Sequence, residues 1–313
     1  MFPSFPKFRT LTDQDRERYN FYYFLQGEPN SDYCFSVIQT WLAYSAPVEV
    51  SQIDEGLIVI RYKDVLLDND TTTLYALIGK HKVLDPEKAE IILQLTGDNS
   101  KLVLSAKQLS RIEDHLTPNY LVTSDLGLND YIYSVTEYSE LDKPDYRRIR
   151  RELNTFERDY PNTKTQIEEV DINDAAIKTR VINTHHSWEN TYKYQNDPDR
   201  VEGKIMAKII SESKQLGVNC LLGVINGKTE GIFLYSDLNM TSGHFINLHH
   251  ARFSYEYKFV NDYLWVLLAK HLKNKGIEYI NFERDANIEG LRKHKQLLKP
   301  KRITSMHLAG QLS

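Results

Sequence analysis

Acidic and basic side chains gather near the end of the sequence, in the stretch INFERDANIEGLRKHKQLLKP at residues 280–300. Glu283 and Asp285 end a short apolar run that is typical of a buried strand. A carboxylate at the tip of such a strand can bind an acceptor amine or remove its proton. The helix predicted after them carries an apolar stripe that consists of Ile288, Leu291, Lys295 and Leu298. Lys295 is the one basic member of that stripe. We therefore interpret Lys295, together with Glu283 and Asp285 at the strand tip, as candidate catalytic residues. We expect the Lys295 ammonium to stabilise developing negative charge or a phosphate.

Structural interpretations of these residues remain open as well. Asp285 or Asn287 can cap the helix, where the helix dipole favours acids. Lys295 either extends past the leucines to solvent or directs its ammonium group into a cleft. Arg292, a candidate for substrate binding, can instead pair with Glu289 one turn earlier, as can Lys293.

Further candidate binding residues lie in the strand HFINLHHARF and in the turn after it. We expect His249, Arg252, Tyr255 and Asn281 to contact the substrate together with Arg292. Packing, or a hydrogen bond at the edge of a cleft, is the alternative for the histidines. No metal site is predicted, because the histidines of this strand lack a clear carboxylate or thiolate partner.

The segment KPDYRRIRRELNTFERDY predicts a helix with two distinct faces. Its apolar face consists of Tyr146, Ile149, Leu153, Phe156 and Tyr160, at spacings of three and four residues. Its basic face carries Arg147, Arg151 and Arg158, which are candidates for binding the phosphates of a nucleic acid. The alternative is a solvated face whose arginines pair with the acids of the same helix.

Composition limits the class of protein. The chain has 313 residues, 41% hydrophobic and 26% charged, with a mean hydropathy of −0.50, which is typical of a soluble two-domain protein. The net charge of −4 means that any polyanion must bind to local basic patches. There is no continuous apolar run long enough for a spanning helix and no signal-peptide pattern. Cys34 and Cys220 are expected to be reduced thiols of a cytoplasmic protein.

The order of predicted elements indicates the fold. From residue 165 it reads helix, helix, hairpin, strand, helix, strand, helix, strand after an initial strand, which is the order of the GCN5-related N-acetyltransferase (GNAT) fold. The first half has a similar order. Residues 116–141 look extended, with turns at Pro118 and Gly127, and PKRITSMHLA is predicted as a last strand. We therefore predict an α/β (α+β) protein with tandem GNAT-like domains, each a mixed sheet flanked by helices. The predicted segments are a first domain at 1–140, a basic connecting helix at 141–164 and a second domain at 165–313 with the active cleft.

Four stretches together resemble one family: SDYCFSVIQTW, LDKPDYRRIRRELNTFERDYP, GVINGKTEG and INFERDANIEGLRKHKQLLKP. The chain is similar to the C-terminal domain of phosphatidylglycerol lysyltransferases and to its stand-alone soluble relatives. Its last stretch also resembles the Gly-Leu-x-x-x-Lys helix of Fem-type peptidoglycan aminoacyltransferases. The resemblance implies transfer of an amino acid from an aminoacyl-tRNA to an amine or hydroxyl acceptor. The arginine helix would then bind the acceptor end of the tRNA. The sequence lacks the membrane-spanning flippase of the lipid-modifying enzymes, which argues against a lipid acceptor. The acceptor is a small molecule or, alternatively, a lipid headgroup.

Two alternative functions remain. The first is an acyl-CoA-dependent N-acyltransferase, which normally holds the CoA pyrophosphate with a Gly-rich turn. The corresponding junction here, HHARFSYEYKFVND, contains no glycine, which favours aminoacyl-tRNA as the donor. The second is a non-catalytic module that binds a small ligand in the same cleft. No bound cofactor is expected under the favoured interpretation.

Overall fold

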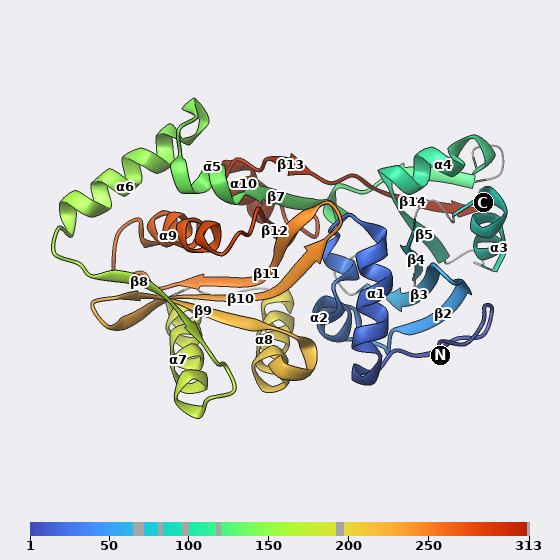
Figure 1. Ribbon diagram of the computed structural model, residues 1–313, viewed down its shortest axis with the longest axis horizontal. Coiled ribbons are helices and arrows are strands. Elements are labelled where there is room, and N and C mark those ends of the chain that lie inside the picture. The colour runs from blue at the N-terminus through green and yellow to red at the C-terminus, as the bar shows by residue number, and fades with distance from the viewer. Residues whose placement is uncertain (65–71, 81–83, 96–99, 117–119, 192–196, 312–313) are drawn as a thin grey trace.

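A computed structural model describes residues 1–64, 72–80, 84–95, 100–116, 120–191 and 197–311. Within these residues the strands form two seven-stranded sheets, which lie side by side along the longest axis of the molecule (Figure 1). Each sheet contains one parallel pair among antiparallel strands. Helices cover both sheets, and the predicted tandem arrangement of mixed sheets with flanking helices is confirmed.

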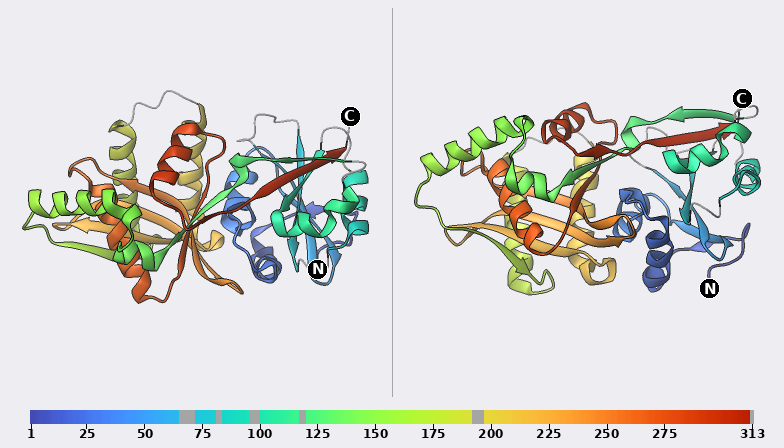
Figure 2. Two further views of the ribbon diagram at one scale, coloured as in Figure 1. Left: turned by 90° about the horizontal axis from the view of Figure 1, so that it is seen from above. Right: turned by 45° about the horizontal axis from the view of Figure 1, so that its top comes forward.

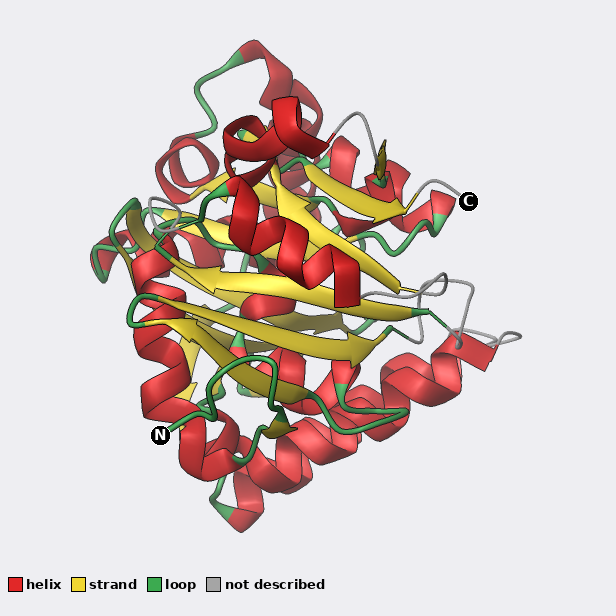
Figure 3. Cartoon of the chain, turned by 90° about the vertical axis from the view of Figure 1, so that its right-hand side faces the viewer, coloured by secondary structure: helices red, strands yellow, loops and turns green. Residues whose placement is uncertain are grey.

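The first sheet has the order β1-β2-β3-β4-β5-β14-β6. Its strands are β1 (Arg9–Thr10), β2 (Glu49–Asp54), β3 (Leu57–Lys63), β4 (Thr73–Gly79), β5 (Ser100–Ser105), β14 (Met306–Gln311) and β6 (Tyr120–Ser124). Apolar side chains of α3 (Pro86–Leu95) and α4 (Ala106–Leu116) pack on one face of this sheet. The other face packs against α1 (Arg16–Gln26), α2 (Phe35–Val37) and the π-helical turn η3 (Ile38–Leu42). Figure 3 shows this end of the molecule with its strands between helices.

The second sheet has the order β13-β7-β12-β11-β10-β9-β8. Its strands are β13 (Arg302–Ile303), β7 (Asp130–Ser134), β12 (Tyr279–Arg284), β11 (Gly243–Phe253), β10 (Lys228–Met240), β9 (Asn219–Ile225) and β8 (Thr165–Val170). Side chains of α7 (Ala175–Thr191) and α8 (Asp197–Leu216) pack on one face. The opposite face is covered by α5 (Val135–Glu140), α6 (Arg147–Asp159) and α9 (Val260–Asn274). α10 (Glu289–Leu297) follows β12 directly.

The two halves exchange strands. β7 lies within the predicted first segment, yet it pairs with β12 and β13 of the second sheet. Conversely, β14 comes from the end of the chain and lies between β5 and β6 of the first sheet. Figure 2 shows both connections running from one half to the other. The segment boundaries at residues 140 and 165 stay a prediction, but the pairing of these strands ties the halves together.

Two predictions about the local structure near these crossings are wrong. The turn predicted at Gly127 is present as a 3₁₀ turn, Leu126–Leu128, and Pro118 lies outside the described residues. The segment from residue 116 is not extended as far as residue 141, because α5 begins at Val135 with the Ser134 hydroxyl accepting a bond from the Glu137 amide, 3.3 Å away. The last strand is not single either. β13 ends at Ile303 and β14 begins at Met306, and the two strands belong to different sheets.

The helices between the two sheets join the halves through a common core. One cluster of buried side chains contains Tyr19 and Phe35 from α1 and α2 together with Ile132 and Phe245 from the second sheet. Burial of this apolar surface stabilises the contact between the halves. Within the described residues, none of the helices is both long and apolar enough to span a membrane.

Candidate functional site at the separation of two parallel strands

The candidate site lies where the parallel strands β11 and β12 separate. Their register runs from Phe245 opposite Tyr279 to Asn247 opposite Asn281 and ends there. In α/β sheets, ligands bind beyond the carboxyl ends of parallel strands at such a point. Two positions beyond the last pair lie His249 on β11 and Glu283 on β12. The structure therefore brings two of the predicted site residues to the same place.

Glu283 has an unusual backbone conformation. Its φ is +57°, and the turn after it also has positive φ at Ala286 (+49°) and Asn287 (+60°). A residue other than glycine in this region costs of order 1–3 kcal/mol and persists where its surroundings fix it. One such contact is local, since the Glu283 amide donates to Asn281 Oδ1 at 2.9 Å. Strain of this kind at the tip of a strand marks a side chain whose direction matters.

Lys295 fixes the same stretch of backbone. Its ammonium group donates to the carbonyl oxygens of Phe282, Glu283 and Arg284 at 2.5, 3.1 and 2.7 Å. The residue is 3% exposed, and burial lowers the pKa of Lys295 to about 8, although nearby carboxylates, Glu283 first, act in the opposite direction. The ammonium therefore neither reaches solvent nor enters a cleft. It holds the tip of β12 in place.

Arg284 anchors the strand tip to the first half of the chain. Its guanidinium lies 3.2 Å from an Asp32 carboxylate oxygen and 2.6 Å from one of Asp64, and all three side chains are buried. Burial raises the pKa of Asp32 to about 7 against the attraction of Arg284. The neighbouring Asp130 accepts bonds from the Ser31 amide and hydroxyl, both at 2.6 Å, and from Asn281 at 2.8 Å. Asn281 is thus a buried structural link.

The Glu283 carboxylate is held through one of its two oxygens. Oε1 accepts from His249 Nδ1 at 2.8 Å and from Asn247 Nδ2 at 2.9 Å. Oε2 takes no hydrogen bond from the part of the chain that the structure describes, and the side chain is 16% exposed. A carboxylate that is oriented on one side and open on the other has the geometry of a general base.

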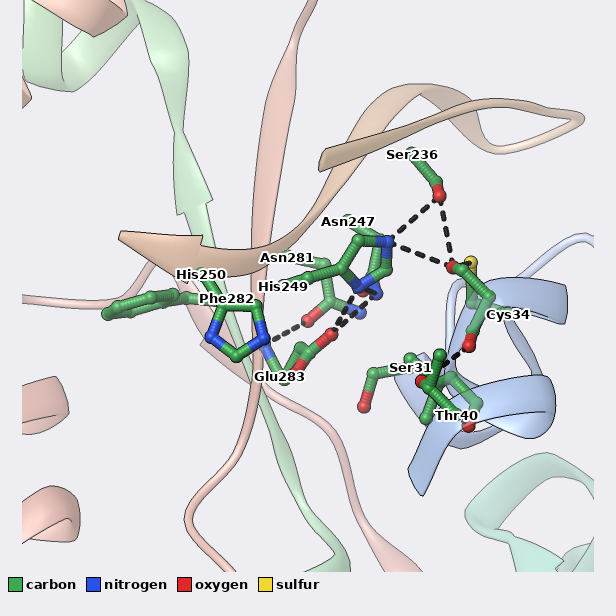
Figure 4. A network of polar contacts seen from close by, with 12 residues as sticks. Ser31, Cys34, Thr40, Ser236, Asn247, His249, His250, Asn281, Phe282 and Glu283 are labelled. Carbon is green, nitrogen blue, oxygen red and sulfur yellow. Dashed lines mark hydrogen bonds and ion pairs between the residues drawn. The ribbon is translucent and has the colours of Figure 1, made fainter. Parts of the chain in front are cut away.

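His249 continues this network toward the first half (Figure 4). Its Nε2 lies 2.9 Å from the Ser36 hydroxyl of α2 and 2.8 Å from the Ser236 hydroxyl of β10. A β-bulge causes its position on the strand, because the register shifts from His250 opposite Leu234 to Leu248 opposite Tyr235. His249 is thus the extra residue, and bulges of this kind redirect side chains next to active sites.

Asp285 belongs to a separate cluster beside the site. Arg292 binds its carboxylate with two bonds of 2.7 and 2.8 Å, and the Tyr131 hydroxyl donates to it at 2.6 Å. Burial acts to raise the pKa of Asp285, but the bonds from Arg292 and Tyr131 prevail and lower it. The predicted capping role is wrong, because Ile288 is the N-cap of α10 and that cap has no side-chain bond. The predicted pairing with Glu289 is confirmed for Lys293, at 2.6 Å, but not for Arg292, which pairs with Asp285 instead.

Arg252 lies further along β11 and faces α7 and α8. Its guanidinium stacks on the Trp188 ring, 4.2 Å from the centroid, and forms an ion pair with Glu202. His250 Nδ1 lies 3.3 Å from the same carboxylate, and burial lowers the pKa of His250 to about 4. Tyr255 is 48% exposed in the turn that follows the strand. The structure therefore places Arg252 and His250 in a cluster that fixes the helices on the sheet.

The basic face of α6 forms a shallow groove of about 470 Å³. It is lined by Arg147, Arg150, Arg151, Asn154, Thr155 and Arg158. The predicted apolar face is confirmed, since Tyr146, Ile149 and Phe156 are at most 2% exposed. Arg148 was not singled out in the sequence, and it pairs with Glu152 and with Asp262 of α9. The arginines of the groove therefore lie on the exposed face of α6, and the opposite, apolar face of this helix is buried.

Sequence reasoning missed Ser36, Ser236 and Asn247. Ser36 lies in the stretch SDYCFSVIQTW and approaches His249 only because α2 packs against the second half, whereas Ser236 lies on β10, the strand paired with β11. Asn247 offered a weak signal, since it stands two residues before His249 and therefore on the same face of β11.

Comparison with known proteins shows which proteins the chain is similar to. The family model described as "Phosphatidylglycerol lysyltransferase, C-terminal" matches residues 101–308. No curated protein sequence matches the chain. A conserved protein of unknown function from Bacteroides thetaiotaomicron VPI-5482 has a similar structure, with a TM-score of 0.78, 19% identity and 100% of each chain covered.

Two further solved structures share the fold. The C-terminal domain (DUF2156) of a putative lysylphosphatidylglycerol synthetase from Agrobacterium fabrum has a TM-score of 0.62 at 15% identity, covering 96% of this chain and 93% of that one. L-PGS from Bacillus licheniformis has a TM-score of 0.64 at 11% identity, covering 97% and 94%. The similarity therefore extends beyond residues 101–308 to almost the whole chain.

Proposed function

We propose that this chain, which belongs to the family of phosphatidylglycerol lysyltransferase C-terminal domains, transfers an amino acid from an aminoacyl-tRNA to an amine or hydroxyl acceptor. The observation that carries the proposal is the Glu283 carboxylate. It stands at the separation of β11 and β12, oriented through Oε1 by His249 and Asn247. An activated ester needs a positioned acceptor and a base more than it needs a covalent cofactor.

The proposed step is a direct attack on the ester. The nitrogen or oxygen of the acceptor forms a bond to the ester carbonyl carbon, and Glu283 removes the proton from that atom. The bond from the carbonyl carbon to the ribose oxygen then breaks, and the ribose oxygen takes up a proton. The products are an amide or ester of the acceptor and a free tRNA. Glu283 serves as general base within hydrogen-bonding reach of the acceptor.

Lys295 acts on this step through the backbone. Its ammonium contacts three carbonyl groups at the tip of β12, so we assign it a positioning role instead of contact with the developing charge. Asp285, fixed by Arg292 and Tyr131, supports the same turn. Glu283 is the one member of this group to which we give direct contact with the substrate.

The groove on α6 is the proposed contact for the tRNA. Arg147, Arg151 and Arg158 are exposed there, and arginines bind phosphate oxygens without regard to base sequence. The net charge of the chain is −4, so a local basic groove of this kind is what a polyanion requires.

The test is a transfer assay with a panel of donors. Purified protein is incubated with radiolabelled lysyl-tRNA, alanyl-tRNA or acetyl-CoA, and with vesicles of phosphatidylglycerol or a soluble primary amine. We expect label to pass to an acceptor from an aminoacyl-tRNA. Transfer from acetyl-CoA alone would contradict the proposal and support the acyl-CoA alternative. Ligand binding without turnover of any donor would contradict it as well and support a binding module.

A further inference from the structure

His249 contacts both halves of the chain through its two ring nitrogens. Nδ1 faces Glu283 Oε1 at 2.8 Å within the second half, and Nε2 faces two hydroxyl groups. Ser36 lies 213 positions earlier in the chain, and Ser236 lies on the neighbouring strand β10. The ring is 8% exposed and both serines are at most 5% exposed.

The Glu283 carboxylate favours a proton on Nδ1 of His249. An ionised carboxylate only accepts hydrogen bonds, so the nitrogen that faces it must donate. The Asn247 amide nitrogen, 3.3 Å from Nδ1, can donate to that atom only in the other tautomer, and its bond to Glu283 Oε1 is shorter, at 2.9 Å. A neutral His249 with its proton on Nδ1 must accept a bond at Nε2.

The two serines supply that bond. Their hydroxyl groups lie 3.0 Å apart and both are within 2.9 Å of Nε2. Only one proton can point at the single lone pair of Nε2, so one serine donates to the ring and the other donates elsewhere. Ser236 can donate to the Gly217 carbonyl at 3.4 Å, and Ser36 lies 3.2 Å from the Cys34 sulfur. Either serine can therefore serve Nε2 when the other does not.

We propose that Ser36 and Ser236 are interchangeable positioning residues that hold His249 in the tautomer with its proton on Nδ1, and thereby hold the Glu283 carboxylate in its working orientation. The consequence for transfer rests on the function proposed above, whereas the tautomer itself does not. The first half of the chain then contributes to the site through Ser36, although the predicted site residues of the cleft lie in the second half.

Interchangeable donors predict a non-additive effect. Ser36→Ala leaves Ser236 to donate, and Ser236→Ala leaves Ser36, so each single variant keeps the Nδ1–H tautomer. The double variant Ser36→Ala/Ser236→Ala leaves a buried Nε2 without a donor. The Nδ1–H tautomer then loses the hydrogen bond that stabilised it relative to the Nε2–H tautomer. Neighbouring residues that share one partner are expected to show such coupling.

The direct readout is nitrogen NMR of the imidazole rings. Protein labelled with ¹⁵N-histidine is recorded at neutral pH without substrate, and the His249 signals are identified by their loss in His249→Gln. We expect the protonated nitrogen of His249 to be Nδ1 in the wild type and in both single variants, and a mixture of tautomers in the double variant. A wild-type His249 protonated mainly on Nε2 would overturn the proposal, and this measurement needs no variant of the serines to fold.

Kinetics give the second readout. The double variant should lower kcat for transfer by about tenfold to a hundredfold with little change in KM, while each single variant stays within about threefold. Thr40→Val is the matched control, because Thr40 follows Ser36 in the same helical segment, donates to its carbonyl at 2.6 Å and is also buried. Equal losses in the single and double variants, or in Thr40→Val, would contradict the proposal. A confirmed tautomer in a protein that transfers nothing would instead refute the proposed function alone.

Discussion

Replacement of Lys295 by methionine tests how the tip of β12 is held. The variant keeps the length of the buried stem and removes the ammonium group, so three carbonyl oxygens lose their donor. Hydrogen bonds from a charged donor contribute roughly 1.5–3 kcal/mol each, or roughly 5–9 kcal/mol for three. Against this, burial lowers the pKa of Lys295 from 10.5 to about 8, which corresponds to a cost of about 3 kcal/mol for the buried charge at neutral pH. The net loss in the free energy of unfolding is then roughly 2–6 kcal/mol.

The assay is equilibrium unfolding in denaturant, with Lys293→Met as the matched control. Lys293 lies on the same helix, but its side chain is 69% exposed and pairs with Glu289. We expect the control to change the free energy of unfolding by less than about 0.5 kcal/mol. Transfer activity of Lys295→Met should fall as well, because Glu283 would no longer be held at positive φ. A Lys295→Met protein as stable as the control and fully active would refute the positioning role.

Three further predictions concern Lys295, the Arg292–Asp285 pair and the groove on α6. The stability of the wild type relative to Lys295→Met should rise between about pH 8 and pH 10.5, because Lys295 keeps its proton in the unfolded chain over this range and loses it in the folded one. Unfolding titrations that show no such rise would be inconsistent with a depressed pKa of Lys295. Arg292→Lys cannot form both bonds to Asp285 and should cost about 1–2 kcal/mol of unfolding free energy by denaturant titration, where an unchanged value would argue against the bidentate pair. Arg151→Ala should weaken tRNA binding and lower the slope of log affinity against log salt concentration by about 1. Filter binding with Lys293→Ala as control measures this slope, and an unchanged slope would show that α6 does not contact the tRNA.

Periodicity predicted the elements that carry the site. The apolar run before Glu283 and the stripe on the following helix locate β12 and α10, and the two faces of residues 143–160 locate α6. These signals are local, because a strand or helix repeats its buried face every two or three to four residues. The resemblance in the same stretches also identified the family, which the match to residues 101–308 confirms.

The partners of the site residues could not be predicted in this way. Lys295 was expected to face charge in a cleft, but its acceptors are backbone carbonyl groups, which no side-chain pattern records. Ser36 reaches His249 from 213 positions away, and β7 and β14 exchange between sheets. The contact of Ser36 and the exchange of strands depend on how the halves pack against each other, which the order of elements does not determine.

Glu283→Gln tests the central claim most directly. Glutamine keeps the size of the side chain and an oxygen that can accept from His249 and Asn247, but it cannot take up a proton from the acceptor. The measurement is the single-turnover rate of transfer from the best aminoacyl-tRNA donor, with tRNA affinity determined in parallel. We predict a rate lower by about 10²–10⁴-fold with unchanged tRNA affinity. A Glu283→Gln protein that transfers within about threefold of the wild-type rate would contradict the account.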